Sequence, residues 1–473
     1  MQTSPPNASW AGATSDGTVT ALPRGDDLVV TAATGKLTIP PSAGVGSGST
    51  VFRFDLLVTP VKPLNTPRHF RRDRYYQYGY NGLADCADIG AMGVEVLNLH
   101  QGVMLNPYIN YPFNHEAMVT QANFSRTCKA MGVKSTKIYY TTRELSNRCH
   151  EMPTLRLLTT EEDQIFDRGV GGGGSWLQEH LQTGYHVRWS TGLADGEVDE
   201  AIADTSLSRW INYYLQGLQW LTEDHPSTAS IDGLYLDELS FDRNTVQRMR
   251  KAVDEKRSGV LFDLHSCNKF HCGVPSSPHA CSALIYMAHF AYLDSLWFGE
   301  GFSPDYSPDQ WLVEMSGVPY GLHAEQLTSP NLWRGMVFAE GARPAPALWK
   351  AWDALKLTAD GVELRGWWEE LPSRMPVVTS NDADIPASAY IRPASAGGGI
   401  VIAVASWKQA GDVSNVTLRI DWTAIGVTAA HATVSAPAIS NFQEATTFSV
   451  AQGGSVTVPV KSPQGWLIEV ASR

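Results

Sequence analysis

Two adjacent carboxylates, Asp237 and Glu238, are the residues of this chain best placed to do chemistry. They follow an apolar run, 234–236, and precede a helical pattern from about Asn244 to Lys256. In an α/β barrel, catalytic groups lie where a strand ends and leads into a helix. Neighbours on a strand point to opposite faces, so a shared site requires the strand to be turning here. We therefore interpret the pair as catalytic rather than as an exposed surface dipeptide.

Several other strand-like segments also end in polar or aromatic residues that can contact a ligand. Such residues are His100 after 94–99, Arg143 after 135–141, His265 and Asn268 after 260–264, and Trp297 and Glu300 in 295–300. Glu300 suits either a nucleophile or a hydrogen-bond partner of sugar hydroxyls, and Trp297 suits either stacking on a sugar face or a place in the core. For His100, Arg143, His265 and Asn268, structural hydrogen bonds are the alternative. Many polar strand ends in one region are typical of the active face of a barrel.

The elements that must position these residues alternate between strand and helix. Predicted strands are 94–99, 135–141, 233–237, 260–264, 295–298 and 319–323, and predicted helices include 209–222, 244–256 and 347–357. No Gly-x-Gly-x-x-Gly follows a strand, so the alternation favours a central (β/α)8 TIM-type barrel over a doubly wound sheet. We place this catalytic domain at residues 61–372.

All-β regions flank the predicted barrel. Residues 1–60 contain strand-like runs at 28–33, 36–39 and 51–58, followed by a proline-rich connector at 59–67. They predict a partial N-terminal β-sandwich. From 373 to 473 the helical period disappears and short alternating runs are separated by Gly-, Asn- and Ser-rich turns, which predicts a C-terminal β-sandwich.

Composition excludes several classes of partner. The chain has 473 residues with a net charge of −12, and its one basic cluster, 68–74, is short and interrupted by Asp73. Nucleic acid is therefore not an expected partner. No window holds the roughly 18 continuous apolar residues that a membrane span needs. Plentiful aromatic residues suit a neutral polar ligand such as a sugar.

Cysteines and glycosylation sequons predict the compartment. The chain has six cysteines, and Asn7, Asn123 and Asn415 lie in Asn-x-Ser/Thr sequons. No secretion signal begins the chain. We expect an extracellular or vesicular protein whose true N-terminus is missing. The cluster of His and Cys at 265–281 fits no zinc spacing, so we expect a loop disulfide or free thiols there, with neither a metal nor a cofactor.

Several segments together resemble glycoside hydrolase family 123, the β-N-acetylgalactosaminidases and their uncharacterised relatives. The matching segments are TPVKP at 59–63, RYY at 74–76, GLYLDE at 233–238, DLHS at 263–266, LWFGE at 296–300 and EMSGVPYG at 314–321. The resemblance spans about residues 50–370. It implies an N-terminal β-sandwich, a central barrel and a C-terminal β domain. The short N-terminal region departs from this pattern and indicates a truncated chain.

The resemblance also implies a mechanism and a glycan substrate. The family's Asp-Glu pair falls on Asp237 and Glu238, and the 2-acetamido oxygen of the substrate acts as nucleophile. Glu238 would then be the general acid and base, while Asp237 would stay ionised and stabilise the oxazolinium-like intermediate. Repulsion between the two would raise the pKa of the acid. Two alternatives remain: direct attack by Glu300 on a non-acetylated sugar, and a catalytically inactive carbohydrate-binding protein on the same scaffold.

Overall fold

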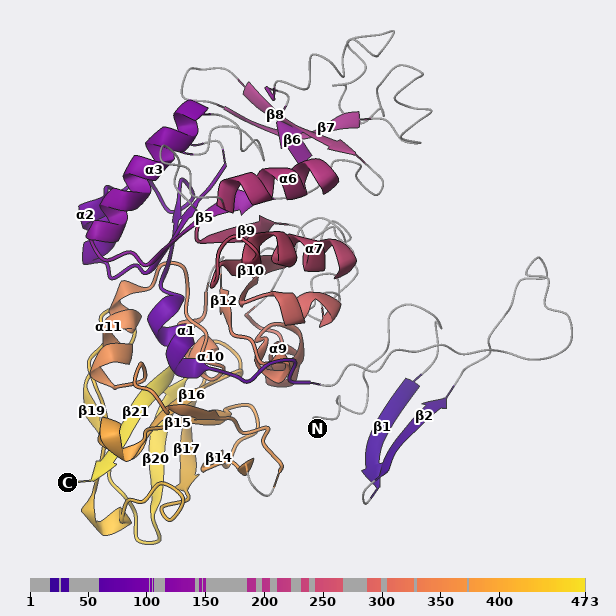
Figure 1. Ribbon diagram of the computed structural model, residues 1–473. Coiled ribbons are helices and arrows are strands. Elements are labelled where there is room, and N and C mark those ends of the chain that lie inside the picture. The colour runs from indigo at the N-terminus through magenta and orange to yellow at the C-terminus, as the bar shows by residue number, and fades with distance from the viewer. Residues whose placement is uncertain are drawn as a thin grey trace, which may run out of the picture.

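A sheet of parallel strands forms the centre of the computed structural model (Figure 1). The structure describes residues 18–24, 27–33, 59–101, 103, 105, 115–140, 144–146, 148–149, 185–192, 198–204, 211–222, 231–237, 243–266, 287–298, 304–326, 330–371 and 374–472. The seven parallel strands are β3 (Tyr75–Tyr78), β4 (Val96–Leu99), β5 (Ser135–Tyr140), β9 (Gly233–Asp237), β10 (Leu261–Ser266), β11 (Ser295–Phe298) and β12 (Ala324–Gln326). These seven strands follow one another in the sheet in the same order as in the chain. A TIM-type barrel has this order, whereas a doubly wound sheet does not.

The chain after β12 contacts segments at both edges of the sheet. Ala342 forms a parallel bridge with Gln326 at the end of β12. On the other side, the Arg343 carbonyl accepts a hydrogen bond of 3.3 Å from Asn81 Nδ2, and the Arg343 guanidinium lies 3.6 Å from the centre of the Tyr75 ring on β3. Ala342 and Arg343 thus connect β12 with β3 and the turn that follows it. The described domain is TIM-barrel-like, with seven parallel strands, and it confirms the predicted fold at this level.

Helices contribute side chains to the hydrophobic core around the sheet. They are α2 (Cys86–Ala91), α3 (His115–Ala130), α6 (Ile211–Thr222), α7 (Arg243–Asp254), α9 (Pro308–Glu314), α10 (Leu332–Met336) and α11 (Pro346–Ala354). Outward-facing strand residues such as Leu97, Ile138, Leu234 and Leu264 join helix residues in one buried hydrophobic cluster. Their neighbours in sequence point to the inner face, since side chains alternate along a strand. This alternation decides which residues reach the site.

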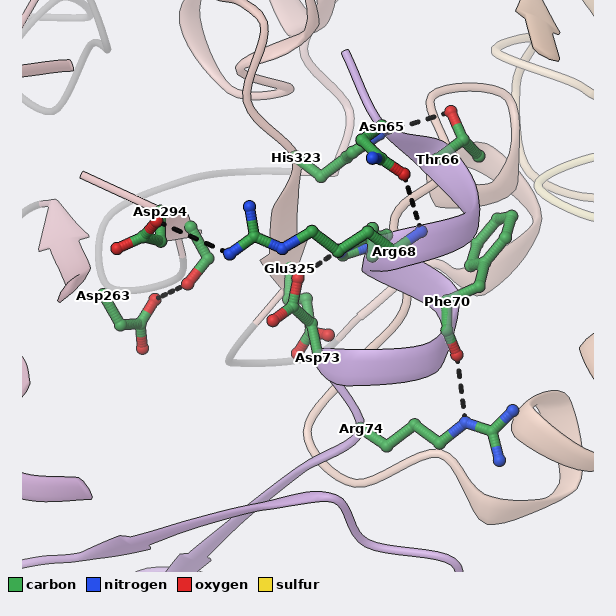
Figure 2. Close-up of polar contacts among 12 residues, drawn as sticks. Asn65, Thr66, Arg68, Phe70, Asp73, Arg74, Asp263, Asp294, His323 and Glu325 are labelled. Carbon is green, nitrogen blue, oxygen red and sulfur yellow. Dashed lines mark hydrogen bonds and ion pairs between the residues drawn. The ribbon is translucent and has the colours of Figure 1, made fainter. Parts of the chain in front are cut away.

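A short helix, α1 (Thr66–Arg72), lies against the N-terminal ends of β11 and β12 (Figure 2). Thr66 Oγ1 lies 3.3 Å from His323 Nε2, and Arg68 pairs with Asp294 at 3.6 Å. The rings of His69 and His323 stack at 4.5 Å. Helix α1 therefore covers the end of the barrel opposite to the carboxyl ends of the strands and leaves those ends for the site.

The C-terminal region consists of antiparallel sheets with a core of their own, as predicted. One sheet has the order β13-β15-β16-β21-β18-β19, and another has the order β14-β17-β20. Residues of both sheets, among them Ile402 and Val458, share one hydrophobic cluster. The strands are β13 (Glu363–Arg365), β14 (Val378–Ser380), β15 (Ala387–Ile391), β16 (Ile400–Ala405), β17 (Val413–Ile420), β18 (Ala432–Ala436), β19 (Thr446–Thr447), β20 (Ser455–Lys461) and β21 (Gly465–Ser472).

One part of the prediction is not confirmed, and another needs correction. The N-terminal β-sandwich is not confirmed, because the described residues before 59 form only the hairpin of β1 (Thr18–Arg24) and β2 (Asp27–Ala33). The predicted strand 319–323 is a turn of 3-10 helix, Val318–Tyr320, and β12 begins at Ala324. Gly317 and Gly321 flank the turn with φ of 69° and 82°, a left-handed backbone that a strand cannot continue.

The structure also contains an antiparallel sheet that the sequence did not predict. It consists of β6 (Glu144–Ser146), β8 (Val198–Asp204) and β7 (Tyr185–Gly192), in that order. The sheet is inserted between β5 and α6, so it follows the strand that carries Tyr139 and Tyr140. Figure 1 shows it beside α6.

Candidate active site

The inner-face residues at the carboxyl ends of β5, β9, β10 and β11 meet in one cluster. The strand register pairs Tyr235 with Tyr139, His265 with Asp237, and Trp297 with His265. All five residues share the inner face, because they alternate with the outward-facing residues of the hydrophobic core. We refer to Tyr139, Tyr235, Asp237, His265 and Trp297 as the strand-end cluster.

Asp237 is the carboxylate at the centre of the strand-end cluster. Tyr139 donates its hydroxyl proton to Asp237 Oδ2 over 2.5 Å, and His265 Nδ1 lies 2.7 Å from Asp237 Oδ1. Burial alone would raise the pKa of Asp237, but the His265 imidazole and the hydrogen bonds from His265 and Tyr139 outweigh it, so the pKa lies below its ordinary value. Asp237 is therefore ionised at neutral pH. Its side chain is still 15% exposed, so a ligand can reach it.

His265 is held by its partners in one orientation. Since an ionised carboxylate only accepts hydrogen bonds, the Nδ1 proton of His265 points to Asp237. The Tyr235 hydroxyl lies 2.6 Å from the same nitrogen, and burial raises the pKa of Tyr235, with the charge of Asp237 adding to the effect. Tyr235 therefore stays protonated. The centre of the Trp297 ring lies 4.7 Å from that of His265 and 5.0 Å from that of Tyr235, so Trp297 packs against both rings.

His100 lies beside the strand-end cluster, directly after β4. Its ring is 5.2 Å from that of Tyr139, and its Nδ1 donates to the Gln101 carbonyl over 3.1 Å. Burial lowers the pKa of His100, so the imidazole is neutral at pH 7. With the proton on Nδ1, Nε2 is left as an acceptor. This arrangement suits a hydrogen bond from a sugar hydroxyl.

A buried charged network supports the cluster from inside the barrel. Arg343 binds Asp263 through hydrogen bonds of 2.9 and 3.1 Å, and it binds Glu325 at 2.7 Å. Burial alone would raise the pKa of Asp263, but Arg343 and then Lys137 outweigh it and hold the pKa at about 2. Burial raises the pKa of Glu325 to about 7 although Arg343 opposes the rise. The Arg343 guanidinium also lies 4.8 Å from the centre of the Trp297 ring, so the charged network contacts the strand-end cluster directly.

Lys137 needs a glycine opposite it to fit inside the barrel. It is paired in register with Gly233 on β9. A Cβ on Gly233 would lie 2.4 Å from the Leu261 carbonyl oxygen and 2.8 Å from Lys137 Cγ, and both distances are too short for a side chain. Burial lowers the pKa of Lys137, while Asp263 opposes this effect. Gly233 thus makes room for a buried cation that stabilises Asp263.

Of the predicted site residues, Asp237, His265, Trp297 and His100 come together as described above. Glu238, Arg143, Asn268 and Glu300 lie outside the described residues. The sequence reasoning missed Tyr139 and Tyr235. The alternation of side chains along 135–140 and 233–237 could have identified them, since it puts both tyrosines on the same face as Asp237.

Other structural features bear on cofactors and compartment. Within the described part of the chain, no group of three or more His, Cys, Asp and Glu residues is arranged to hold a metal ion. No helix among the described residues is long and apolar enough to cross a membrane. Cys86 and Cys128 form a disulfide that joins α2 to α3. The predicted cysteine loop at 267–281 lies outside the described residues.

Comparison with known proteins defines the class. The model of the glycoside hydrolase 123 TIM-barrel domain matches residues 65–345, and that of the glycoside hydrolase 123 C-terminal domain matches residues 344–471. The first match alone covers more than half of the chain. The protein therefore belongs to glycoside hydrolase family 123, and it is a glycosidase of the TIM-barrel type. A search of curated proteins found no match.

Several solved structures are distantly similar to this chain. A noncanonic maltogenic α-amylase from Thermotoga neapolitana has 9% identity and a TM-score of 0.47, over 84% of this chain and 98% of that one. An α-amylase from Anoxybacillus has 9% identity and a TM-score of 0.46, over 82% and 91%. An α-amylase from Lactobacillus plantarum has 12% identity and a TM-score of 0.44, over 86% and 100%. At these identities and scores, the substrates of those enzymes say nothing about this one.

Proposed function

We propose that this protein hydrolyses the glycosidic bond of an N-acetylated hexosamine, with the acetamido group of the substrate as nucleophile. Asp237 orients the acetamido N–H and stabilises the positive charge that develops on the oxazolinium-like intermediate. Glu238 protonates the leaving oxygen and then acts as a base towards water.

A secreted or vesicular enzyme would fit this role, and the disulfide between Cys86 and Cys128 supports that compartment.

The observation that carries the proposal is the environment of Asp237. A general acid must hold a proton near neutral pH, which requires a raised pKa. Asp237 has a lowered pKa, since Tyr139 and His265 each donate a hydrogen bond to one of its oxygens. It is therefore suited to stabilise positive charge and unsuited to donate a proton. This leaves the neighbouring Glu238 as the acid.

Asp237 is held in one orientation before a substrate binds. Tyr139 donates a hydrogen bond to Oδ2 and His265 donates one to Oδ1. No reorganisation of the carboxylate is therefore needed when positive charge develops on the substrate.

The test compares acetylated with non-acetylated substrates. The enzyme should cleave aryl N-acetyl-β-galactosaminide or N-acetyl-β-glucosaminide and should leave the plain β-galactoside and β-glucoside intact. A thiazoline analogue of the intermediate should inhibit, because analogues of the transition state bind far more tightly than substrates. Cleavage of the plain glycosides at a comparable rate would rule out substrate assistance.

The alternative mechanism, direct attack by Glu300, gives the opposite results. Glu300→Gln would then abolish turnover and thiazolines would have no effect. Under substrate assistance, Glu300→Gln weakens binding but leaves substantial turnover. If wild-type enzyme binds glycans and cleaves none of these substrates, the scaffold is a carbohydrate-binding protein instead.

A further inference from the structure

An exposed aromatic ring, Tyr80, lies on the turn that follows β3, at the same end of the barrel as the strand-end cluster. Its side chain is 52% exposed, whereas Tyr139 and Trp297 are 5% and 1% exposed. Tyrosine combines a large apolar ring with a polar hydroxyl, so an exposed ring beside an active site is able to contact a ligand.

The Tyr80 ring is connected to the site by two ring contacts. It lies 6.3 Å from the His100 ring at an interplanar angle of 27°, and 6.4 Å from the Trp297 ring at 89°. His100 in turn contacts Tyr139, which is hydrogen-bonded to Asp237. Tyr80 is therefore separated from Asp237 by an intervening layer of side chains. It lies at the rim of the site and not at its catalytic centre.

The turn that carries Tyr80 is rigid, because its neighbours are hydrogen-bonded on several sides. Asn81 accepts from the Gln77 backbone through its side chain at 2.8 Å and donates to the Arg343 carbonyl at 3.3 Å. The Tyr76 hydroxyl donates to the Asn81 carbonyl at 3.2 Å. Gly79, with φ of 99°, allows the close turn against Val103. A ring on such a turn can bind a ligand without a large loss of conformational entropy.

We propose that Tyr80 is a platform for a second sugar, the one next to the sugar that reacts. The C–H face of a pyranose ring packs well on an exposed aromatic face, and sugar-binding sites use a few fixed aromatic rings in this way. This inference rests on the proposed glycosidase function and adds to it that the natural substrate is longer than a single sugar. In a disaccharide, the sugar bound by Tyr80 is the leaving group.

The experiment measures kcat and KM on two substrates that differ only in the second sugar. One is a methyl glycoside of the N-acetylhexosamine, and the other is a disaccharide with a sugar in place of the methyl group. Tyr80→Ala should raise KM for the disaccharide by roughly tenfold, the upper range for one aromatic contact. It should change KM for the methyl glycoside less than twofold and leave kcat on both substrates nearly unchanged.

Two matched variants separate a platform from a general surface effect. Tyr80→Phe keeps the ring and should retain the wild-type KM within about threefold. Leu83→Ala removes another exposed apolar side chain, 69% exposed, from the same connection and should change neither KM. An equal effect of Tyr80→Ala on both substrates would overturn the assignment to the second sugar.

The outcomes also distinguish this inference from the proposed function. If the wild-type enzyme cleaves the acetylated substrates and Tyr80→Ala keeps the wild-type KM for the disaccharide, only the platform is refuted. If the wild-type enzyme neither cleaves nor binds any N-acetylhexosaminide, the proposed function and the platform are both refuted.

Discussion

Glu340→Gln should stabilise the protein at alkaline pH and leave its stability at pH 5 almost unchanged. Glu340 is buried beside α10, and both its oxygens accept hydrogen bonds from Trp311 Nε1 on α9, at 3.1 and 3.0 Å. Burial raises the pKa of Glu340 to about 8, although the bond from Trp311 opposes the rise. The folded protein therefore keeps a proton at neutral pH that the unfolded chain releases.

The size of the effect follows from linkage. Below the ordinary pKa of 4.5, Glu340 is protonated in both the folded and the unfolded state, so it does not change the free energy of unfolding. As the pH rises towards 8, only the unfolded chain releases this proton, so the free energy of unfolding falls. A rise from 4.5 to about 8 corresponds to roughly 5 kcal/mol at about 1.4 kcal/mol per pH unit. Relaxation around the charge reduces this cost, so we expect about 2–4 kcal/mol at pH 9.

The assay is urea unfolding at pH 5 and pH 9. Glutamine has the shape of the protonated acid and can still accept from Trp311, so wild type and Glu340→Gln should unfold alike at pH 5. At pH 9 the variant should be more stable. Glu370→Gln removes a charge from an exposed site and serves as the control, with little change at either pH. An equal difference between wild type and Glu340→Gln at both pH values would refute the reasoning.

Three further predictions concern the site and its support. Tyr139→Phe removes a hydrogen bond that lowers the pKa of Asp237, so the loss of activity on the acid side of the pH–rate profile should begin at a higher pH. Tyr140→Phe, on the outer face, should leave the profile in place. Arg343→Met leaves two buried carboxylates without their partner and should lower the free energy of urea unfolding by about 3–5 kcal/mol. An unchanged free energy of unfolding would contradict the claim that Arg343 stabilises these two carboxylates. Reduction of the bond between Cys86 and Cys128, which are 42 residues apart, should lower stability by about 2–4 kcal/mol in the same assay.

The strands that carry the site were predictable because their sequences agree locally with their fold. The segments 233–237 and 295–298 have the predicted bounds, since each is an apolar run that ends at polar residues. Strand β3, Tyr75–Tyr78, was missed because it follows the charged residues of α1 and carries polar Gln77 in its middle. Its place in the sheet is determined by pairing with β4.

The interior of the barrel was less predictable than its strands. Arg343 and Asp263 are 80 residues apart, and no local pattern indicates that one guanidinium binds both Asp263 and Glu325. In the structure, both carboxylates lie beneath the strand-end cluster. Such pairings arise only in the folded sheet, because they depend on contacts between distant segments.

The central claim is that Asp237 stabilises charge while Glu238 transfers the proton. The most direct test is kcat/KM for Glu238→Gln and Asp237→Asn on two N-acetylhexosaminides, one with a good leaving group and one with an unactivated sugar alcohol. Glu238→Gln should lose at least about 100-fold on the unactivated substrate and much less on the activated one, because a good leaving group needs no proton. Asp237→Asn should lose a similar factor on both. Full activity of Glu238→Gln on the unactivated substrate, or a loss for Asp237→Asn that is confined to it, would contradict this division of roles.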